Sequence, residues 1–507
     1  MLARPRRPLQ AFVKPGGADF GVCCAVRRLA LLLAFLGPAS GAVAQPADCT
    51  VDAALERSAS GLALDVHYRC RGASDGVTFH AESERIARHV ADFSDPRGYP
   101  VAALDDRWRV TVRDGIAQAR YRYDLSGYAR VAASNSWAIQ HGGGVLALLS
   151  SWLLEPREVA SVPTIDITVR PETGLAFAAG LPRAGDAWGL AGVTLRFAGY
   201  SVLGAFDLRD IDLPAPGSLR PGATPARSRL RLAILGDREP QARDDLADWV
   251  RRTALAQTHY WDGFTYDGAL MALVPGGSRP VGFGRVVPGG GVSGMIQIGA
   301  RVDPRRLFDD WVLTHELIHT GMPFVRGRAT WFMEGAATYI EPIVRARAGW
   351  KSEAEVWTEW LEQMPIGVSA FDAPLVQVQG RQAYWAGALF MLLADLGIRQ
   401  ASGGAHGLED CLKGALHAGF TGDRRVSLAE YVDACDRATG TTAMSTLVRR
   451  HVADATPVNL AALWRDLGVA REDGRIVLDD MAPLARWRRL IVPGIGPPRH
   501  VPRPWEN

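Results

Sequence analysis

The segment FDDWVLTHELIHTG, residues 308–321, contains the most informative spacing of residues in the sequence, His315-Glu316-x-x-His319. On a helix, His315 and His319 lie one turn apart on the same face, so both imidazoles can reach one metal ion. Glu316 lies about 100° around the helix from His315, since a helix has about 3.6 residues per turn. It can therefore act on a metal-bound water without becoming a ligand. This spacing predicts a buried helix that carries a hydrolytic zinc site.

Two histidines leave a zinc ion short of a third protein ligand. The segment WFMEGAATY, residues 331–339, offers Glu334, which follows His319 by 15 residues, and the glycines and proline between them allow a turn. The neighbours of Glu334 are apolar or small, so a carboxylate buried there needs a cationic partner. We predict that His315, His319 and Glu334 bind one Zn²⁺ ion and that Glu316 is the general base. An ordinary surface carboxylate is the alternative for Glu334.

Glu341 follows Glu334 by seven residues and therefore shares its helix face. From there it could orient a ligand histidine through the free ring N–H. Arg345, four residues further on, is the rival partner in a plain ion pair along the helix. Pro342 is expected to kink or end this helix near its position.

Three segments together resemble the gluzincin metallopeptidases, and within them the glycyl aminopeptidase family. They are H-E-x-x-H, the W-F-x-E-G-x-x-x-Y segment, and a Y-x-x-G-A-L helix at residues 384–389 that continues into LLADLGIR at residues 392–399. The resemblance implies the zinc ligands and the base named above. It also implies that Tyr384 stabilises the oxyanion, with helix packing as the alternative role of this aromatic residue.

One stretch departs from that family. Its aminopeptidases place Gly-x-Met-Glu-Asn or Gly-Gly-Leu-Glu-His on a strand ahead of the zinc helix, where the glutamate holds the free amino terminus of the substrate. The corresponding residues here are Ser293, Gly294, Met295, Ile296 and Gln297, which we predict to form a substrate-binding strand. Because Ile296 takes the place of the glutamate and cannot pair with an ammonium group, the sequence argues against aminopeptidase specificity.

Period-two alternation dominates the N-terminal part of the chain, as in half-buried strands. It is clear from Leu62 to Cys70 and from Trp108 to Val112. The pair Asp114-Gly115 then favours a hairpin into a strand around Tyr121. Many short strands separated by turns predict a β-sandwich-like domain over residues 45–225.

The remainder of the chain has a different pattern. Residues 214–228, rich in Pro and Arg, are predicted to be a linker, and residues 282–294 a glycine-rich loop. Helical periodicity is expected near residues 307–320, 330–347, 353–364, 383–399, 406–418, 427–438 and 441–454. With the order of domains that the resemblance implies, we expect an α+β protein. After the β-sandwich-like domain we expect a thermolysin-like (zincin) catalytic domain over residues 226–350 and a mainly helical C-terminal domain over residues 351–482. The chain would then end in an extended Pro/Arg-rich tail, residues 483–507.

Residues 1–44 have the pattern of a secretory signal peptide. The apolar run LALLLAFL, residues 29–36, follows basic residues and precedes the triplet Ala42-Val43-Ala44, which predicts cleavage after Ala44. This apolar run is too short to span a bilayer, because a spanning helix needs about 20 apolar residues. We therefore expect an exported protein, periplasmic or secreted, with no transmembrane helix in the mature chain. An uncleaved anchor is the alternative.

Cleavage there leaves four cysteines, Cys49, Cys70, Cys411 and Cys435. An even number in an oxidising compartment favours disulfides. Three pairings are open, of which Cys49 with Cys70 and Cys411 with Cys435 are local in sequence.

Charge and composition narrow the function further. The chain has 57 Lys+Arg against 54 Asp+Glu, a formal charge of +3 that gives no indication of nucleic-acid binding. We predict a zinc metallopeptidase that hydrolyses a peptide or protein substrate; the sequence gives no oligomeric state. Two alternatives stay open: a non-catalytic, zinc-stabilised envelope protein that binds a partner, and an endopeptidase that acts on blocked peptides.

Overall fold

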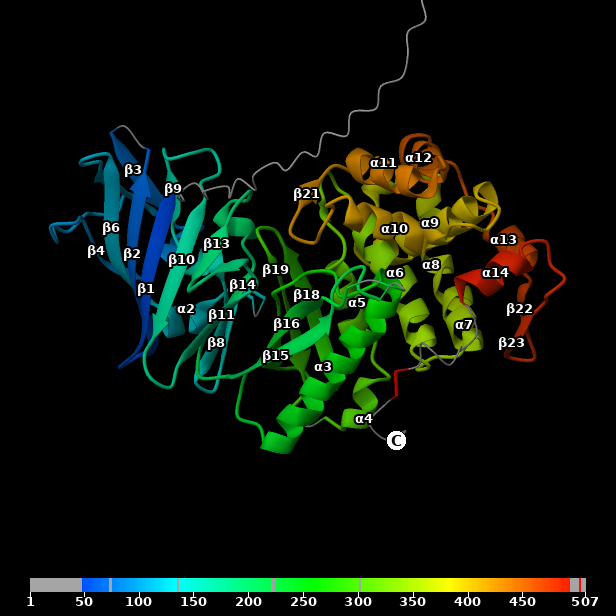
Figure 1. Cartoon of the computed structure of the whole chain (residues 1–507), viewed down its shortest axis with the longest axis horizontal. Coiled ribbons are helices and arrows are strands. Elements are labelled where there is room, and N and C mark those ends of the chain that lie inside the picture. Colours follow the sequence, from blue (N-terminus) through cyan, green and yellow to red (C-terminus); the bar gives the residue numbers. More distant parts are fainter. Residues whose placement is uncertain are drawn as a thin grey trace, which may run out of the picture. The chain divides into compact units, whose positions relative to one another are not determined.

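Strands make up most of the blue to cyan part of the ribbon and helices most of the yellow to red part (Figure 1). The computed structural model describes residues 48–72, 75–134, 136–219, 222, 224–300, 302–492 and 501–502. The predicted signal peptide, residues 1–44, lies outside these residues. Within them, no helix is both long and apolar enough to cross a membrane. The predicted mixture of α and β structure is confirmed.

A seven-stranded sheet contains the first two strands at its centre. Side chains of β1 and β2 are buried in alternation, as the period-two pattern predicts. In spatial order the strands are Arg183–Ala184 (β12), Ala187–Leu190 (β13), Ile165–Pro171 (β10), Cys49–Ser58 (β1), Gly61–Arg71 (β2), Ile116–Asp124 (β6) and Val90–Ser94 (β4).

Two smaller sheets share a hydrophobic core with the seven-stranded sheet. This core includes Tyr68 of β2, Phe79 of β3 and Val145 of β8. The three-stranded sheet contains, in spatial order, Arg107–Thr111 (β5), Gly76–His80 (β3) and Glu155–Arg157 (β9). The four-stranded sheet contains Ala176–Ala179 (β11), Tyr200–Gly204 (β14), Gly144–Leu148 (β8) and Ala138–His141 (β7).

The hairpin predicted at Asp114-Gly115 exists as a turn but not as a strand pair. Both residues have positive φ, 52° and 73°, as a two-residue hairpin turn requires. The only bridge across the turn joins Arg113 to Ile116. Beyond it β5 pairs with β3, whereas β6 pairs with β2 and β4. The prediction of a simple hairpin was wrong because the two strands enter different sheets of the shared core.

A five-stranded mixed sheet follows, and both faces of its central strands β17 and β19 are buried. In spatial order its strands are Asp207–Pro214 (β15), Arg227–Ile234 (β16), Ala269–Pro275 (β17), Val292–Ile298 (β19) and Val281–Pro288 (β18). On β17, Leu270, Ala272 and Val274 pack toward the four-stranded sheet. Met271 and Leu273, which alternate with them, pack toward the helices. Alternation between two cores explains the continuous apolar run in this strand.

Two predictions fail in this sheet. Residues 214–228, predicted to be a linker, connect the antiparallel neighbours β15 and β16, so the expected boundary at residue 225 lies inside a hairpin. Residues 282–294, predicted to be a glycine-rich loop, form most of β18 and the start of β19. Glycine lowers strand propensity, but here the strands are stabilised by pairing and by contact with a helix, which local composition does not reveal.

Helices cover the face of this sheet opposite the four-stranded sheet and continue to the C-terminal part. In chain order all α-helices of the described residues are Glu84–Ala87 (α1), Leu125–Val131 (α2), Pro240–Trp261 (α3), Pro304–Leu307 (α4), Val312–His319 (α5), Thr330–Arg347 (α6), Glu353–Gln363 (α7), Pro365–Val368 (α8), Gly380–Ala401 (α9), Leu408–His417 (α10), Leu428–Thr439 (α11), Ala443–Val448 (α12), Leu460–Leu467 (α13) and Ala485–Ile491 (α14). The seven predicted helical segments are confirmed as α5 to α7 and α9 to α12. Two further strand pairs are β20 (Phe324–Val325) with β21 (Arg425–Val426) and β22 (Val469–Glu472) with β23 (Arg475–Leu478).

Two parts of the expectations for the helical region are contradicted: the helix end near Pro342, which was one of two alternatives with a kink, and an extended conformation at the start of the tail. The helix α6 does not end near Pro342 but continues to Arg347. An internal proline costs roughly 3 kcal/mol or more, and burial of Tyr339 and Ile343 in the large core on both sides of it offsets that cost. The predicted extended tail begins with a helix, α14, because Trp487 and Ile491 complete the same core.

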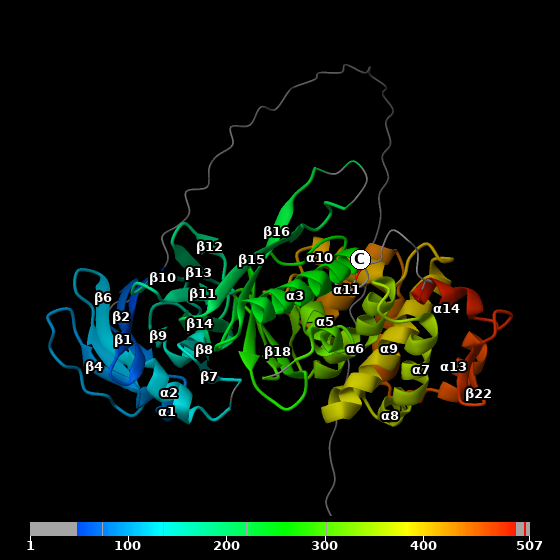
Figure 2. The ribbon, with the colours of Figure 1, turned by 90° about the horizontal axis from the view of Figure 1, so that it is seen from below.

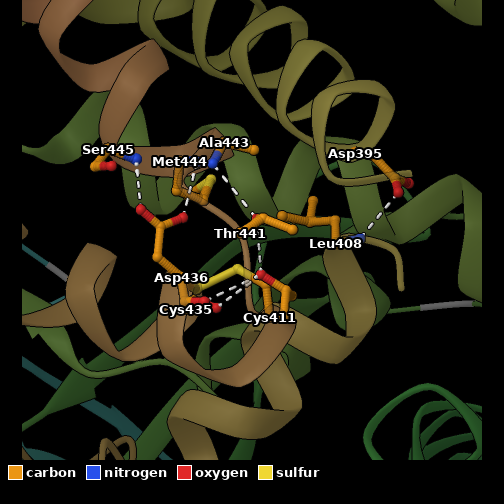
Figure 3. The surroundings of a disulfide bond; sticks show 10 residues. Asp395, Leu408, Cys411, Cys435, Asp436, Thr441, Ala443, Met444 and Ser445 are labelled. Carbon is orange, nitrogen blue, oxygen red and sulfur yellow. Dashed lines mark hydrogen bonds between the residues drawn. A yellow bond between two sulfur atoms is a disulfide. The ribbon is translucent and has the colours of Figure 1, made fainter. Parts of the chain in front are cut away.

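The two disulfides join the local cysteine pairs. Cys49–Cys70 connects the antiparallel neighbours β1 and β2, and Cys411–Cys435 connects α10 with α11. Figure 3 shows that Asp436, beside the second disulfide, accepts hydrogen bonds from the backbone N–H groups of Met444 and Ser445, each 3.0 Å long. The disulfide therefore fixes α11 at the position where its aspartate caps α12.

The helices α6 and α9 lie side by side in both views of the ribbon (Figures 1 and 2). Gly335 of α6 and Gly387 of α9 meet at their crossing. A Cβ atom on Gly335 would lie 2.2 Å from the Cα of Gly387, and one on Gly387 would lie 1.9 Å from the carbonyl oxygen of Trp331. These two glycines allow the helix axes to approach closely, which places Tyr384 beside Glu334.

Candidate metal centre and cleft

The helix α5 holds the H-E-x-x-H residues in a buried position. The amide of Gln257 on α3 donates a 2.6 Å hydrogen bond to the carbonyl of Thr314. At the N-terminal end of α5, the carboxylate of Asp310 accepts a 2.7 Å hydrogen bond from the N–H of Val312. These contacts fix the helix between the five-stranded sheet and α6.

His315, His319 and Glu334 come together as the sequence predicts. The Nε2 atom of His315 lies 3.1 Å from Oε2 of Glu334, and Nε2 of His319 lies 3.5 Å from the same oxygen. One ligand atom from each of the three residues lies within 4.8 Å of the others. Two imidazoles and one carboxylate at this spacing match the donor set of a catalytic zinc site, so these residues fit the metal.

The electrostatics of the three residues suit a cation. Burial alone would raise the pKa of Glu334, but the charge of His319 and hydrogen bonds from both histidines lower it well below its ordinary value. Burial likewise opposes the charged form of His319, yet the carboxylate of Glu334 raises the pKa of that imidazole. The carboxylate is therefore ionised, and it attracts positive charge to this point.

Glu316 is the second buried carboxylate of α5, and it stands apart from the three candidate ligands. Burial raises its pKa, while the charges of His319 and His315 and the backbone N–H of Val286 oppose that shift. Val286 belongs to β18, and the strand comes this close because residue 284 is a glycine. A Cβ atom on Gly284 would lie 2.7 Å from Cγ and 2.9 Å from Oε1 of Glu316.

Replacing Gly284 by alanine is expected to reduce hydrolytic activity on the order of 100-fold, because displacement of a reacting group by about 1 Å has a cost of this size. Zinc content should stay unchanged, since the new methyl group meets Glu316 and Val312 rather than a ligand. The measurement is kcat/KM together with bound zinc. Gly282→Ala on the same strand is the control, because its Cβ would meet only the Gln297 side chain and backbone, at 3.3 Å or more. Equal activity of the two variants would contradict the role given to Gly284.

Tyr384 of α9 reaches the same site. Its ring stacks on that of His315, with a centroid distance of 5.9 Å and an interplanar angle of 20°. Burial raises the pKa of its phenol, and the charge of Glu334 and a hydrogen bond to that carboxylate raise it further. The phenol is therefore protonated at neutral pH and able to donate a hydrogen bond.

Glu341 does not contact a ligand histidine. Its Oε1 accepts a 3.0 Å hydrogen bond from Arg345, which is the rival partner that the sequence left open. Arg345 also donates to the carbonyl of Asp309, 3.0 Å away, and so connects α6 to the segment before α5. Within the described part of the chain, Nδ1 of His315 has no hydrogen-bond partner. The orienting role predicted for Glu341 is wrong in this structure because the arginine lies closer.

The predicted substrate-binding residues Gly294, Met295, Ile296 and Gln297 lie on β19, which is an interior strand. Its backbone pairs with β17 on one side and β18 on the other. Met295 and Ile296 are fully buried in the two cores that flank the sheet. The prediction that this strand binds substrate was wrong, because β19 has no free edge. The strand at the edge of the sheet and beside Glu316 is β18.

A cleft of about 530 Å³ opens over the candidate metal centre. One wall comes from α5, α6, α9 and β18, and the other mostly from short helices and loops of the N-terminal part. Its lining includes Glu316, His319, Glu334, Tyr384, Phe283, Arg285, Tyr128, Trp137, Glu82 and Arg196. A larger hollow of about 750 Å³ on the N-terminal sheets includes none of the candidate catalytic or metal-binding residues.

Sequence reasoning missed β18 and the N-terminal wall of the cleft. The alternation of glycine with larger residues in VGFGRV, residues 281–286, was a sign of a strand with one face against a neighbour. No comparable sign exists for Trp137 or Arg196, because their approach to the cleft depends on how the sheets pack.

One comparison with a solved structure supports this fold. No protein-family model and no curated protein matches the sequence. Among solved structures, the chain is similar to an aminopeptidase N family protein from Idiomarina loihiensis, with a TM-score of 0.58, 14% identity, and coverage of 83% of this chain and 78% of that one. For Legionella pneumophila aminopeptidase A the TM-score is 0.48, with 9% identity and coverage of 80% and 50%, which is too low to establish a common fold. The first likeness establishes a fold similar to that of an aminopeptidase N family protein.

Proposed function

We propose that this protein is a zinc-dependent metallopeptidase. The observation that carries the proposal is the convergence of His315, His319 and Glu334 within 4.8 Å, beside a separate buried carboxylate, Glu316, in an open cleft. A structural zinc site fills its fourth position with protein and needs no base. The presence of Glu316 therefore favours catalysis over the alternative of a non-catalytic zinc protein.

The residues of the chain divide the work of hydrolysis. Zinc, when bound, supplies Lewis-acid polarisation of the scissile carbonyl. Glu316, which lines the cleft apart from the three candidate ligands, takes a proton from the attacking water and passes it to the leaving amine. Tyr384 donates a hydrogen bond to the developing oxyanion, a contribution typically worth about 3 kcal/mol.

The edge strand β18 is the surface on which a peptide would lie. It ends the five-stranded sheet, and Phe283, Gly284 and Arg285 line the cleft. An extended peptide can add to such an edge through main-chain hydrogen bonds. Phe283 has half of its surface exposed, which offers an apolar contact to a substrate side chain.

Export belongs to the same proposal. Disulfides persist in oxidising compartments, and the described residues of this chain contain two. Together with the signal-peptide pattern of residues 1–44, they support a periplasmic or secreted enzyme.

Metal removal is the test of the proposed function. We expect about one zinc ion per chain, turnover of a mixed peptide library, loss of turnover on chelation, and recovery when zinc is added back. The library is presented with free and with N-acetylated amino termini, since these two forms separate an aminopeptidase from an enzyme that acts on blocked peptides. Bound zinc without any cleavage would contradict the peptidase and leave the non-catalytic alternative.

A further inference from the structure

Two arginines, Arg196 and Arg285, line the cleft, and Arg285 is the one that lies on the strand next to Glu316. This residue is half-buried at the centre of the edge strand β18. Side chains alternate along a strand. Because Gly284 faces Glu316 on α5, Arg285 lies on the other face, toward the N-terminal sheets.

The surroundings of Arg285 place its guanidinium close to the catalytic side of the cleft. Tyr200 of β14 donates a 2.8 Å hydrogen bond to the carbonyl of Ser136, so its phenol is fixed. Burial raises the pKa of Tyr200 to about 12; the charge of Arg285 and a hydrogen bond with it oppose this shift, whereas the charge of Glu316 adds to it. Arg285 and Glu316 both line the cleft, and both influence this phenol.

The other arginine of the cleft, Arg196, differs from Arg285 because it has a carboxylate partner. Arg196 is paired with Glu82, at 3.5 Å. For Arg285, no carboxylate of the described residues lies within the 4.0 Å distance of an ion pair. A guanidinium is always charged and presents a planar set of donors that fits a carboxylate. Among the described residues, Arg285 is therefore a cation of this cleft that has no carboxylate partner and can bind an anion.

We propose that Arg285 binds a carboxylate of the substrate, either an acidic side chain or the C-terminal carboxylate, while the peptide lies along β18. The proposal rests on the proposed peptidase function and gives its substrate class. A cation on this strand repels an amino terminus and attracts an acidic group. The expected substrate is therefore an acidic peptide, which does not need a free amine.

The test uses alanine hexapeptides in which one position at a time carries Glu or Gln, each made with a C-terminal carboxylate and with a C-terminal amide. For the wild type we expect kcat/KM to be at least about tenfold higher for the acidic member of one pair, which corresponds to about 1.4 kcal/mol. The Glu/Gln pairs report a side chain and the acid/amide pairs report the C-terminus. In Arg285→Gln this ratio should fall to about one, and Arg285→Lys should retain part of it.

Arg196→Gln is the matched control, because that cation already has a carboxylate partner. Its preference should equal that of the wild type. Ratios of one in the wild type, an unchanged ratio in Arg285→Gln, or a loss confined to Arg196→Gln would each overturn the proposal. The melting temperature of each variant checks that the fold is intact.

A binding experiment separates failure of the proposed peptidase function from failure of the proposed carboxylate site. If the wild type cleaves none of these peptides, the same peptides are titrated into wild type and Arg285→Gln. Binding at least about tenfold tighter for the acidic form, lost in the variant, would support the carboxylate site without catalysis. Equal affinities, or no binding, would overturn it.

Discussion

Glu316→Gln is expected to abolish peptide hydrolysis while zinc stays bound. Glutamine has nearly the shape of glutamate but cannot accept the proton of the attacking water, and loss of a general base typically lowers kcat on the order of 10²- to 10⁴-fold. Metal binding should be retained, because the three candidate ligands are His315, His319 and Glu334. The measurement is kcat on the best peptide of the library, with zinc content determined on the same sample.

Glu341→Gln is the control for this experiment. Both carboxylates are buried near the zinc helices, but Glu341 pairs with Arg345 and contacts no candidate ligand. We expect this control to lower the melting temperature, because Arg345 loses its charged partner, while kcat stays within a few-fold of wild type. Retention of full activity in Glu316→Gln would refute the assignment of the base, and loss of zinc would show that Glu316 serves the metal instead.

Gly387→Ala is expected to destabilise the protein by roughly 1–3 kcal/mol, the usual cost of an overpacked site. Helix propensity alone gives the opposite sign, since alanine is better than glycine in a helix by about 1 kcal/mol. The contact between α6 and α9 decides the outcome. The added methyl group would lie 1.9 Å from the carbonyl oxygen of Trp331, so α9 has to move. Chemical denaturation measures the difference.

The same helix supplies the control, Gly397→Ala. A Cβ atom at Gly397 would meet only Ala443, at an ordinary distance of 3.6 Å. This variant should be as stable as wild type or more stable. Displacement of α9 in Gly387→Ala should also separate Tyr384, three residues earlier, from Glu334 and reduce kcat. If both variants had the same free energy of unfolding, the close approach of the helices would not matter.

The contact between Gly335 and Gly387 gives a physical reason why two separate sequence motifs occur together in this chain. Each motif contains a glycine: Gly335 in W-F-x-E-G and Gly387 in Y-x-x-G-A-L. These two glycines contact each other where α6 and α9 cross. Each motif therefore carries one functional side chain and the glycine that positions it against the other. From the sequence, Tyr384 could be connected to Glu334 only through the family resemblance, because no local pattern brings residues so far apart together.

Local spacing allowed much of the site to be predicted. Four residues on a helix place His315 and His319 on one face whatever surrounds them, and this geometry is intrinsic to the helix. Likewise, alternation in β1 and β2 depends only on the pleat of a strand. The helices α5 to α7 and α9 to α12 were found because each has its own apolar face.

The strand order of the five-stranded sheet could not be predicted in this way. Ile296 was matched to the amine-binding position because it precedes the zinc helix in sequence, yet β18 occupies the edge and β19 the interior. Which strand faces the cleft depends on long-range pairing, and a sequence pattern records only which residues of a strand are buried.

By itself, then, the sequence determined the zinc-binding spacing and many of the helical and strand segments, since each of these depends on residues that are near neighbours along the chain. It left three cysteine pairings open, and the structure shows that the two local pairs form. The tertiary structure alone decided that Glu341 pairs with Arg345, that β18 borders the cleft, and that Arg285 enters it without a carboxylate partner among the described residues. These facts depend on packing between segments that are distant in sequence, and local periodicity carries no information about such contacts.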